Sequence, residues 1–599
     1  MPDDYVVLTD NPLRGQILDD VKRVANGGKV LLDDGTKAVL AERRQQIEDF
    51  VGQFDEPAYG FNRGFGHNVN LKVDAAGWDE LQTNLIRSHS CGVGEPAPRQ
   101  VVRGAMYLRA VSLARGYSAV RPAVVEKLVE LLNADIVPLV PRLGSVSASG
   151  DLAPLSHMAL ALLGEGEVFY RGEKLPAARA LATAAIAPLR LKMKEGLALN
   201  NGVQYSTAYG IWCLEALECL LKTAAIATAL TAQVMLGADT PFRDDLHQLR
   251  PHRGSVRVAR WLFALMGNSP MREAHRHFDV DGEVQDPYNL RCAAQILGTC
   301  ADLLERARST FATEAVSVTD NPIILKAGTE FEKARRDAKA AGFINQYVDI
   351  VSGGHFHGMP IAVDGYGLLQ ACAIMARLSN MRVVRYVDGQ KNKGLGDDLK
   401  WGGNLDILEK WDSVKQWANN KGITLPRDFE AHVDSMRNEK NQVEKEQAFS
   451  SAFMIPEYVS AGLTNWIWGS CMPNHLFSLS TDAGQEDHVS MAANIVVRLH
   501  DTLPRVAEVL AIELAFAAQS AALRKQMRCI PSRDHDWHPL EVAETRLNEV
   551  GEAVLTAVEG LFPLVRRDRP LANDISRLGE TVLQGQIVRA AEGAGFVFN

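Results

Sequence analysis

Apolar residues recur at helical spacing along most of the chain beyond about residue 81. The segments LEALECLLKTAAIATALTAQV and LPRVAEVLAIELAFAAQSAAL place leucine, isoleucine, valine and alanine on a three-to-four-residue period, which is typical of α-helices. Few stretches alternate apolar and polar residues as strands do. The pattern therefore predicts a mainly α-helical body of long helices packed as a bundle.

The beginning of the chain has a different pattern. Up to about residue 75 it mixes a strand-like stretch, KVLLDD, with a charged helical run over 37–51 and glycine-rich loops. This part predicts a small α+β head. The body then covers 76–384 and 446–599, and the polar interval 385–445, with its glycine and charge clusters, predicts an insertion or a lid-like subdomain.

The apolar segment 208–237 resembles a membrane span, but Glu215, Glu218 and Lys222 interrupt it. The charge-free remainder is too short to cross a bilayer, so we expect a helix buried within the protein and no membrane partner.

Composition narrows the classes of function. The chain has 599 residues, of which 46% are hydrophobic, and a net charge of −9 that is spread along it, so we expect a folded protein that binds small molecules and no nucleic acid. Eight cysteines without a C-x-x-C pair predict reduced thiols. The start MPDDYVVLTDNPLRG lacks the basic and apolar parts of a targeting signal, which predicts a cytoplasmic location.

The stretch GSVSASGDLAPLSHMAL, residues 144–160, places three small residues before an apolar helical segment. A turn followed by a helix start is the simplest interpretation, because serine, aspartate and glycine suit helix beginnings. Further polar motifs fall between the apolar segments and bring polar side chains to helix ends: YGFNRGFGHNVN, RSHSCGVGEP, LALNNGVQ, QDPYNLRC, SVTDNP, SGGHFHGMP and GQEDHVSM. Isolated polar groups in an apolar body are costly unless they are paired, so together these motifs indicate a shared site.

Metal binding and serine hydrolysis are disfavoured by spacing. His355, His357 and His488 lie near two carboxylates in the motifs, but no H-E-x-x-H or two-histidine, one-carboxylate spacing occurs. No G-x-S-x-G elbow follows a strand. We therefore expect no catalytic metal.

The ordered set of motifs resembles the aromatic amino acid lyase family. In this family a tripeptide like Ala148-Ser149-Gly150 cyclises by itself to a 4-methylidene-imidazol-5-one group, and the motifs follow in the same order over residues 59–491. The resemblance implies a fumarase/aspartase-like helical fold, a homotetramer with sites shared between subunits, and no metal or dissociable cofactor. Head and body would form the catalytic unit.

The resemblance also implies roles for individual residues. Tyr59 would be the base that removes the substrate's β-proton, and Arg291 would bind its carboxylate. The remaining implied positions are Asn201 and Tyr288 for positioning the reacting groups, Gln285 and Phe356 for lining the pocket, and His89 and Glu486 for binding an imidazole ring.

Within the family, the Ser88-His89 pair and the QEDHVSM motif resemble the members that act on histidine. The implied reaction is elimination of ammonia from L-histidine to give urocanate. Arg63, His355 and the extra segments near 327–345 and 388–445 depart from the family pattern, so a lyase or 2,3-aminomutase acting on a modified histidine, phenylalanine or tyrosine stays open. An inactive helical scaffold is a further alternative, disfavoured by the intact tripeptide.

Overall fold

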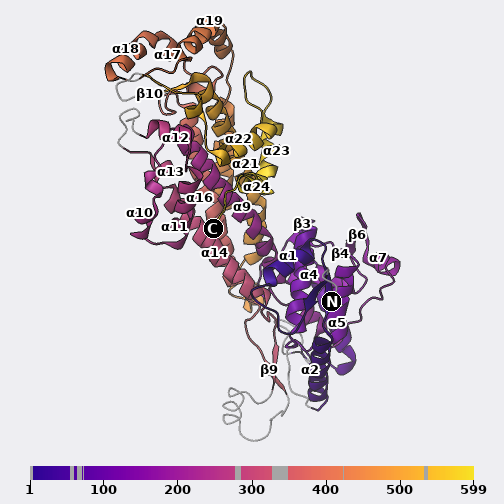
Figure 1. Ribbon diagram of the computed structural model, residues 1–599. Coiled ribbons are helices and arrows are strands. Elements are labelled where there is room, and N and C mark those ends of the chain that lie inside the picture. Colours follow the sequence, from indigo (N-terminus) through magenta and orange to yellow (C-terminus); the bar gives the residue numbers. More distant parts are fainter. Residues whose placement is uncertain are drawn as a thin grey trace. The chain divides into compact units, whose positions relative to one another are not determined.

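The computed structural model describes residues 5–53, 60–61, 63, 71, 73–276, 285–326, 348–422, 424–531 and 537–599 (Figure 1). The chain divides into two units, each treated by itself below. Unit 1 consists of Met1–Leu214, Arg306–Tyr366 and Pro473–Leu499, and unit 2 of Glu215–Glu305, Gly367–Met472 and His500–Asn599.

The N-terminal head of unit 1 has the predicted α+β character. Strand β1 (Tyr5–Leu8) pairs in parallel with β2 (Lys29–Leu32), which is the predicted KVLLDD strand. Helix α1 (Ile17–Ala25) connects them and buries Ile17, Val21 and Val24. Helix α2 (Asp34–Gln53) contains the predicted charged run.

The rest of unit 1 surrounds this head with short helices and small sheets. The sheets are β3 (Val93–Pro96) with β5 (Pro141–Leu143), β4 (Val137–Pro138) with β6 (Glu167–Tyr170) and β7 (Glu173–Pro176), and β8 (Ile323–Lys326) with β9 (Val348–Val351), all antiparallel. The helices are α3 (Trp78–His89), α4 (Arg99–Ala114), α5 (Pro122–Asn133), α6 (Leu152–Leu162), α7 (Ala177–Thr183) and α8 (Glu195–Asn200), with short 3-10 turns at Ala75–Gly77, Asn474–Leu476 and Asp482–Gly484.

Four long helices confirm the predicted helical body. They are α9 (Gln204–Val234), α14 (Ala293–Ala315), α16 (Met359–Val387) and α21 (Ala492–Met527). The boundary between the units falls inside each of these helices. Their apolar residues are largely buried, as the helical period of the sequence requires.

Unit 2 packs shorter elements around its parts of the long helices. The helices are α10 (Asp244–Gln248), α11 (Arg253–Leu265), α12 (Pro270–His275), α13 (Tyr288–Arg291), α20 (Met454–Ser470), α22 (Glu549–Leu561), α23 (Ala572–Leu583) and α24 (Gln586–Gly593). The strands are β10 (Cys529–Pro531) and β11 (Trp537–Pro539), and 3-10 turns lie at Thr240–Phe242 and Ala543–Thr545.

A buried ion pair joins α16 to α21 inside unit 2. Arg382 donates from Nε to Glu513 Oε1 at 2.5 Å and from Nη2 to Oε2 at 2.8 Å, and both side chains are almost wholly buried. Thr231 of α9 donates to the same Glu513 Oε1 at 2.7 Å. Removing one partner of such a pair costs about 3–5 kcal/mol, because the other charge is left buried without a partner. The contacts of Glu513 thus link α9, α16 and α21.

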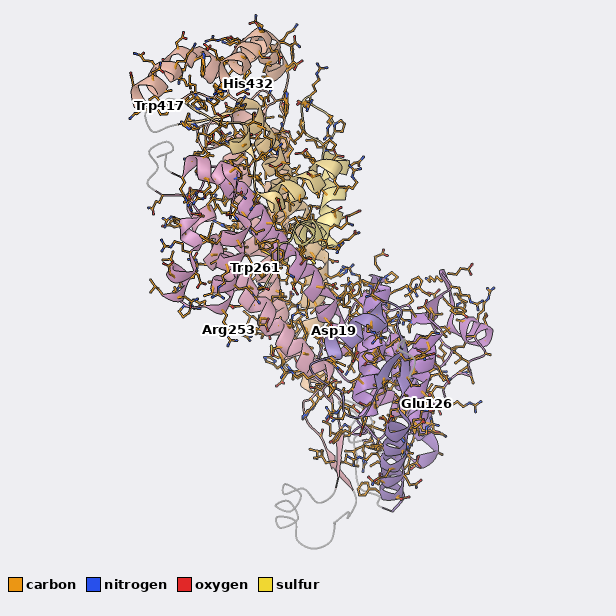
Figure 2. All side chains as sticks on the ribbon, viewed as in Figure 1. Asp19, Glu126, Arg253, Trp261, Trp417 and His432 are labelled. Carbon is orange, nitrogen blue, oxygen red and sulfur yellow. The ribbon has the colours of Figure 1, made fainter. Side chains whose placement is uncertain are left out.

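The polar interval 385–445 contains helices as well as loops. A 3-10 turn at Asp397–Leu399 precedes α17 (Asp406–Glu409), α18 (Trp411–Lys421) and α19 (Phe429–Ala448). Trp411 and Phe429 are fully buried with ring centroids 5.1 Å apart. His432, labelled with Trp417 in Figure 2, donates to the Gln526 carbonyl at 2.9 Å. The interval thus packs on the end of α21, and its lid role stays a prediction.

Two of the described helices, α16 and α21, are long and apolar enough to cross a membrane by length and composition. The most apolar window of α21 is 89% buried within the protein, which is typical of a core helix. The segment 208–237, whose apolar run resembles a span in the sequence, lies mostly in α9 and is likewise largely buried.

Candidate functional site

The Ala148-Ser149-Gly150 turn lies in unit 1 between β5 and α6. Gly150 has a φ of +83° and forms a parallel bridge with Gly202, the residue after Asn201. A Cβ on Gly150 would lie 2.2 Å from the Gly202 carbonyl oxygen. No residue with a side chain fits there, so the glycine of the tripeptide is required by close backbone approach.

A buried carboxylate follows the turn. Asp151 is fully buried and accepts hydrogen bonds from Ser147 Oγ at 3.0 Å, Ser206 Oγ at 2.7 Å, Ser206 N at 2.8 Å and, at 3.4 Å, Ser145 Oγ. Burial raises the pKa of Asp151, and these hydrogen bonds oppose the rise. The carboxylate ties the turn to the first residues of α9.

The N-termini of three helices meet the turn. Asp151 is the residue before α6, Ser206 N belongs to the first turn of α9, and Ala493 N of α21 donates to Ser147 Oγ at 3.1 Å. Unpaired backbone N–H groups and the helix dipole both favour negative charge at such ends. The segment therefore lies in surroundings that stabilise an anion.

Glu486 approaches the turn from a segment more than 300 residues away. Its Oε1 accepts a hydrogen bond from Ser149 Oγ at 2.8 Å, and its Oε2 accepts one from Thr481 Oγ1 at 2.6 Å. The backbones of Thr481 and Glu486 also pair with each other. The carboxylate is thus held in one orientation against the serine of the tripeptide.

His89, at the end of α3, lies within electrostatic range of this carboxylate. Its Nδ1 is 3.0 Å from Ser88 Oγ. Burial lowers the pKa of His89 from its usual 6.5, and the Leu85 carbonyl and the carboxylates of Glu486 and Asp482 oppose that shift. The predicted pair His89 and Glu486 is therefore brought together with Ser149 in unit 1.

Asn201 lies beside the tripeptide turn, because it directly precedes Gly202, which forms the bridge with Gly150. It is 1% exposed, and its Oδ1 has no hydrogen-bond partner among the described residues. Its backbone carbonyl accepts from Arg109 Nη1 at 2.6 Å, and the same nitrogen donates to Gln204 Oε1 at 3.1 Å. A buried acceptor without a partner is costly, which fits a position that pairs with a bound group.

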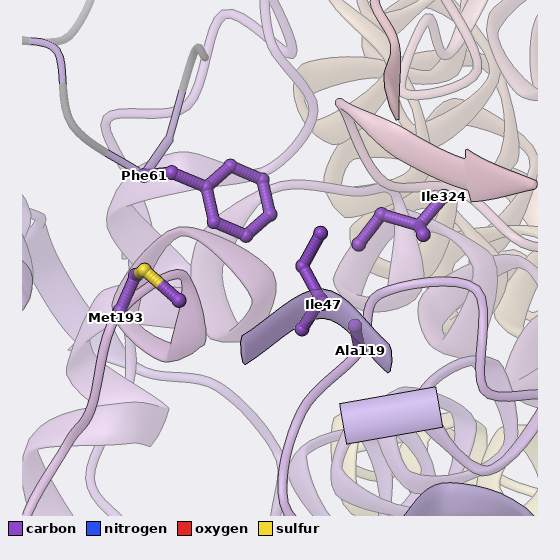
Figure 3. Close-up of a cluster of buried hydrophobic side chains, with 5 residues drawn as sticks. All are labelled: Ile47, Phe61, Ala119, Met193 and Ile324. Atoms are coloured by element: carbon purple, nitrogen blue, oxygen red, sulfur yellow. The ribbon is translucent and has the colours of Figure 1, made fainter. Parts of the chain in front are cut away.

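Tyr59 lies outside the described residues, but the two residues that follow it are firmly packed. The Gly60 carbonyl accepts from Gln82 Nε2 at 3.2 Å, and Phe61 is fully buried. Phe61 belongs to a cluster with Ile47, Ala119, Met193 and Ile324 (Figure 3). Gly60 and Phe61, which directly follow Tyr59 in the sequence, are therefore held in place.

A buried ion pair lies beside that anchor. Lys194 Nζ donates to Asp320 Oδ2 at 2.8 Å, and neither side chain is exposed. A Cβ on Gly60 would lie 3.3 Å from Lys194 Cδ. Burial lowers the pKa of Lys194, while Asp320 opposes the shift. Asp320, which belongs to the SVTDNP motif, thus provides the negative charge that pairs with the buried Lys194.

Two further motifs meet in unit 1. His357 Nε2 donates to the His488 carbonyl at 3.1 Å, and their rings lie 5.7 Å apart. Phe356, predicted to line the pocket, is half-buried in this loop, and His355 is exposed. The SGGHFHGMP and GQEDHVSM motifs are therefore adjacent, as a shared site requires.

The predicted residues Gln285, Tyr288 and Arg291 belong to unit 2. Arg291 Nε donates to the Asp286 carbonyl at 2.9 Å, and its guanidinium lies 4.6 Å from the Tyr288 ring centroid. Tyr288 is 69% exposed and Gln285 is exposed. Arg291 itself is half-buried.

Some residues of the site were missed by sequence reasoning. Arg109 contacts the predicted Asn201, and Thr481 contacts the predicted Glu486. The other missed residues are Ser147 and Ser206, which bind Asp151, and Lys194, which binds Asp320. Of these residues, only Ser147 lies in a stretch that the sequence analysis singled out, the serine-rich run before the tripeptide, and that run predicted only a turn. Among the described residues, no group of three or more histidine, cysteine, aspartate or glutamate side chains is arranged to hold a metal ion.

The helical fold and the tight turn at Ser149 agree with what comparison with known proteins shows, a lyase. The family model for aromatic amino acid lyases matches residues 17–408 and 407–535. The chain belongs to this family.

Individual relatives are similar over nearly the whole chain. The chain is 35% identical over 571 residues to the histidine ammonia-lyase of Deinococcus radiodurans, covering 95% of this chain and 93% of that protein. The structure of histidine ammonia-lyase from Trypanosoma cruzi has a TM-score of 0.75 at 26% identity, covering 98% and 95%. Tyrosine aminomutase from Streptomyces globisporus has a TM-score of 0.79 at 27% identity, covering 99% and 100%.

We expect His89 to titrate below pH 6.5 because burial disfavours its charged form. Replacement of Glu486 by glutamine removes an opposing negative charge, so the His89 midpoint should fall further. Nuclear magnetic resonance of ring-labelled histidine, with the signal assigned from a His89→Gln variant, measures both midpoints. Glu173→Gln, on the exposed strand β7, is the control and should leave the midpoint unchanged. A midpoint that rises in Glu486→Gln would contradict this electrostatic description.

Proposed function

We propose that the protein eliminates ammonia from L-histidine to give urocanate, using a 4-methylidene-imidazol-5-one group formed from Ala148-Ser149-Gly150. The observation that carries the proposal is the hydrogen bond from Ser149 to Glu486, with His89 in electrostatic range of the same carboxylate. It joins the tripeptide to two side chains suited to an imidazole. The curated relatives named histidine ammonia-lyase support the substrate.

The tripeptide fits such a group. The Gly150 nitrogen adds to the Ala148 carbonyl carbon, and the nitrogen's proton passes to the carbonyl oxygen. That oxygen leaves as water with the Ser149 N–H proton, and the Ser149 hydroxyl leaves as a second water with the Ser149 Cα proton. No oxidant is needed. The φ of +83° at Gly150 and the bridge to Gly202 support this turn as the place of closure.

The ring, once formed, supplies an electrophilic methylidene carbon at the position of the Ser149 side chain. The helix N-termini around the turn favour negative charge that develops there. Asn201, whose buried Oδ1 has no partner within the described ranges, is suited to hold the group or the substrate amine. Tyr59 is proposed to take the β-proton of the substrate.

Glu486 and His89 are proposed to bind the imidazole of the substrate. A neutral histidine offers one donor and one acceptor, and a carboxylate offers two acceptors, so together they match an imidazole N–H and ring nitrogen. The lowered pKa of His89 supports the neutral form. Phe356 and Gln285 are proposed to line the pocket, and Tyr288 and Arg291 to position the substrate, Arg291 by binding its carboxylate as a fork.

We infer a homotetramer with shared active sites, in the cytoplasm. Tyr288 and Gln285, near Arg291 in unit 2, are exposed, which suits residues completed by another subunit. Helix α20 exposes several large apolar side chains, which is typical of a surface that binds a partner: Ile455, Tyr458, Val459, Trp466 and Trp468. A second copy of the chain is the proposed occupant.

The aminomutase alternative is favoured by one observation, the similarity to the tyrosine aminomutase structure. Such an enzyme would share the elimination step and return the amine to the β-carbon. The two outcomes differ only in product, so a product assay separates them.

The mass of the intact protein should lie two waters below its sequence mass, because both dehydrations are internal. Ser149→Ala should keep the full mass and lose turnover, since it has no hydroxyl to eliminate. Circular dichroism checks that the variant is folded. An active preparation at full sequence mass would show that the prosthetic group is not formed from this tripeptide.

Mixing Tyr59→Phe with Arg291→Ala should restore part of the activity that each variant lacks. Shared sites then combine an intact Tyr59 from one subunit with an intact Arg291 from another. Each variant mixed with itself is the control, and native mass spectrometry confirms subunit exchange. If exchange is complete and activity stays absent, these two residues belong to one subunit's site.

Histidine should be deaminated at least about 100-fold better than phenylalanine or tyrosine, because an apolar ring leaves buried polar partners unpaired. His89→Leu should lower kcat/KM for histidine and raise it for phenylalanine, while Glu173→Gln on the exposed strand β7 should change the ratio little. Ammonia, urocanate and β-amino acids are measured on one preparation, with N-methylated histidines included. Equal turnover of histidine and phenylalanine would reject the substrate assignment and keep the lyase chemistry.

A further inference from the structure

Ser147, the residue before the tripeptide, has an unusual backbone conformation. Its φ is +50°, in the left-handed region that favours glycine, and it is fully buried. A residue with a Cβ is strained there and persists only where its surroundings hold it. Its side chain must therefore contribute something that a glycine lacks.

Every polar group of Ser147 has a partner. Its backbone N–H donates to Ser145 Oγ at 3.1 Å, and its carbonyl accepts from Ser490 Oγ at 3.1 Å. Its hydroxyl donates to Asp151 Oδ1 at 3.0 Å and accepts from Ala493 N at 3.1 Å. Ser147 is thus fixed from three directions.

The bond between Ser147 and Asp151 spans the tripeptide. The two residues flank Ala148, Ser149 and Gly150 on either side, and the hydrogen bond between their side chains closes the turn into a loop. On the far side, Asp151 N donates to the Gly202 carbonyl at 2.7 Å. We call the Ser147 Oγ–Asp151 Oδ1 bond the clasp.

We propose that Ser147 is a positioning residue for ring closure: through the clasp it holds the two ends of the tripeptide together so that the Gly150 nitrogen approaches the Ala148 carbonyl carbon. This rests on the proposed function. The assisted step forms one C–N bond and moves one proton from that nitrogen to the carbonyl oxygen, and the two waters leave as described above. Pre-ordering the reacting atoms raises the rate of an intramolecular step.

Ser147→Gly separates the clasp from the backbone strain. Glycine suits a φ of +50°, so the variant should fold at least as well as the parent protein. It lacks the hydroxyl, however, so ring closure should slow about tenfold or more, which is the effect of losing one hydrogen bond to a charged group. Ser147→Ala, which keeps the strain and lacks the hydroxyl, should slow closure to a similar extent.

The readout is the intact mass of the full chain at successive times after cell-free synthesis, from which the rate of loss of two waters is obtained. Turnover per chain that has lost both waters should equal that of the parent protein, because Ser147 does not touch the substrate in this proposal. The midpoint of denaturant unfolding reports folding separately.

Two serine variants serve as controls. Ser206→Ala removes another hydrogen bond from Asp151 without opening the clasp, so it should slow closure less than Ser147→Gly. Ser520→Ala removes a fully buried hydroxyl that has no partner in the described part of the chain, so it should leave the rate unchanged.

Each outcome decides between the proposals. If the parent protein never loses two waters, the prosthetic group itself is absent and the proposed function fails. If the parent closes and Ser147→Gly closes at the same rate, only the clasp is wrong. Equal slowing by Ser206→Ala and Ser147→Gly would assign the effect to the Asp151 carboxylate and would overturn the clasp as well.

Discussion

The close approach of Gly150 to Gly202 is the constraint on which the site depends. The backbones bridge so tightly that neither residue has room for a side chain, and Gly202 itself is enclosed by Gln204, Thr319 and Arg109. This contact aligns the turn before α6 with the turn before α9. The N-termini of both helices consequently face the tripeptide segment. Their partial positive charge favours negative charge on the residues near it.

Buried charges around this contact are each given partners, which explains why so many polar groups enter an apolar body. Asp151 accepts hydrogen bonds from serine hydroxyls and from a backbone N–H of α9. Lys194 pairs with Asp320. Arg109 donates hydrogen bonds to a backbone carbonyl, a side-chain amide oxygen and a hydroxyl. Burial without partners would cost several kcal/mol per charge. The network therefore stabilises the turn in one conformation, which is what a reaction between neighbouring backbone atoms requires.

Much of the fold could be predicted from the sequence, because the helical period of apolar residues repeats over many positions and a few exceptions do not hide it. The helices α9 and α21 and the strand at Lys29–Leu32 follow from local pattern alone. The resemblance implied that His89, Ser149 and Glu486 contribute to one site. The structure joins Ser149 to Glu486 by a hydrogen bond, and His89 interacts electrostatically with the same carboxylate. Ser147 and Arg109 could not be found in this way. Their importance comes from a positive φ and from contacts with distant segments, and neither leaves a period or a spacing in the sequence.

Under the proposed function, Glu486 contacts Ser149 before the prosthetic group forms and binds the imidazole of the substrate afterwards. Its Oε2 is held by Thr481, and its Oε1 accepts from the Ser149 hydroxyl. Ring formation removes that hydroxyl as water, so the Oε1 loses its donor while the carboxylate keeps its orientation. A half-buried carboxylate oxygen without a donor favours any ligand that brings an N–H. The imidazole of histidine supplies one, whereas the ring of phenylalanine carries no hydrogen-bond donor. Under the proposed function, the loss of water that forms the electrophilic group thus also frees Glu486 Oε1 to bind the imidazole N–H of the substrate.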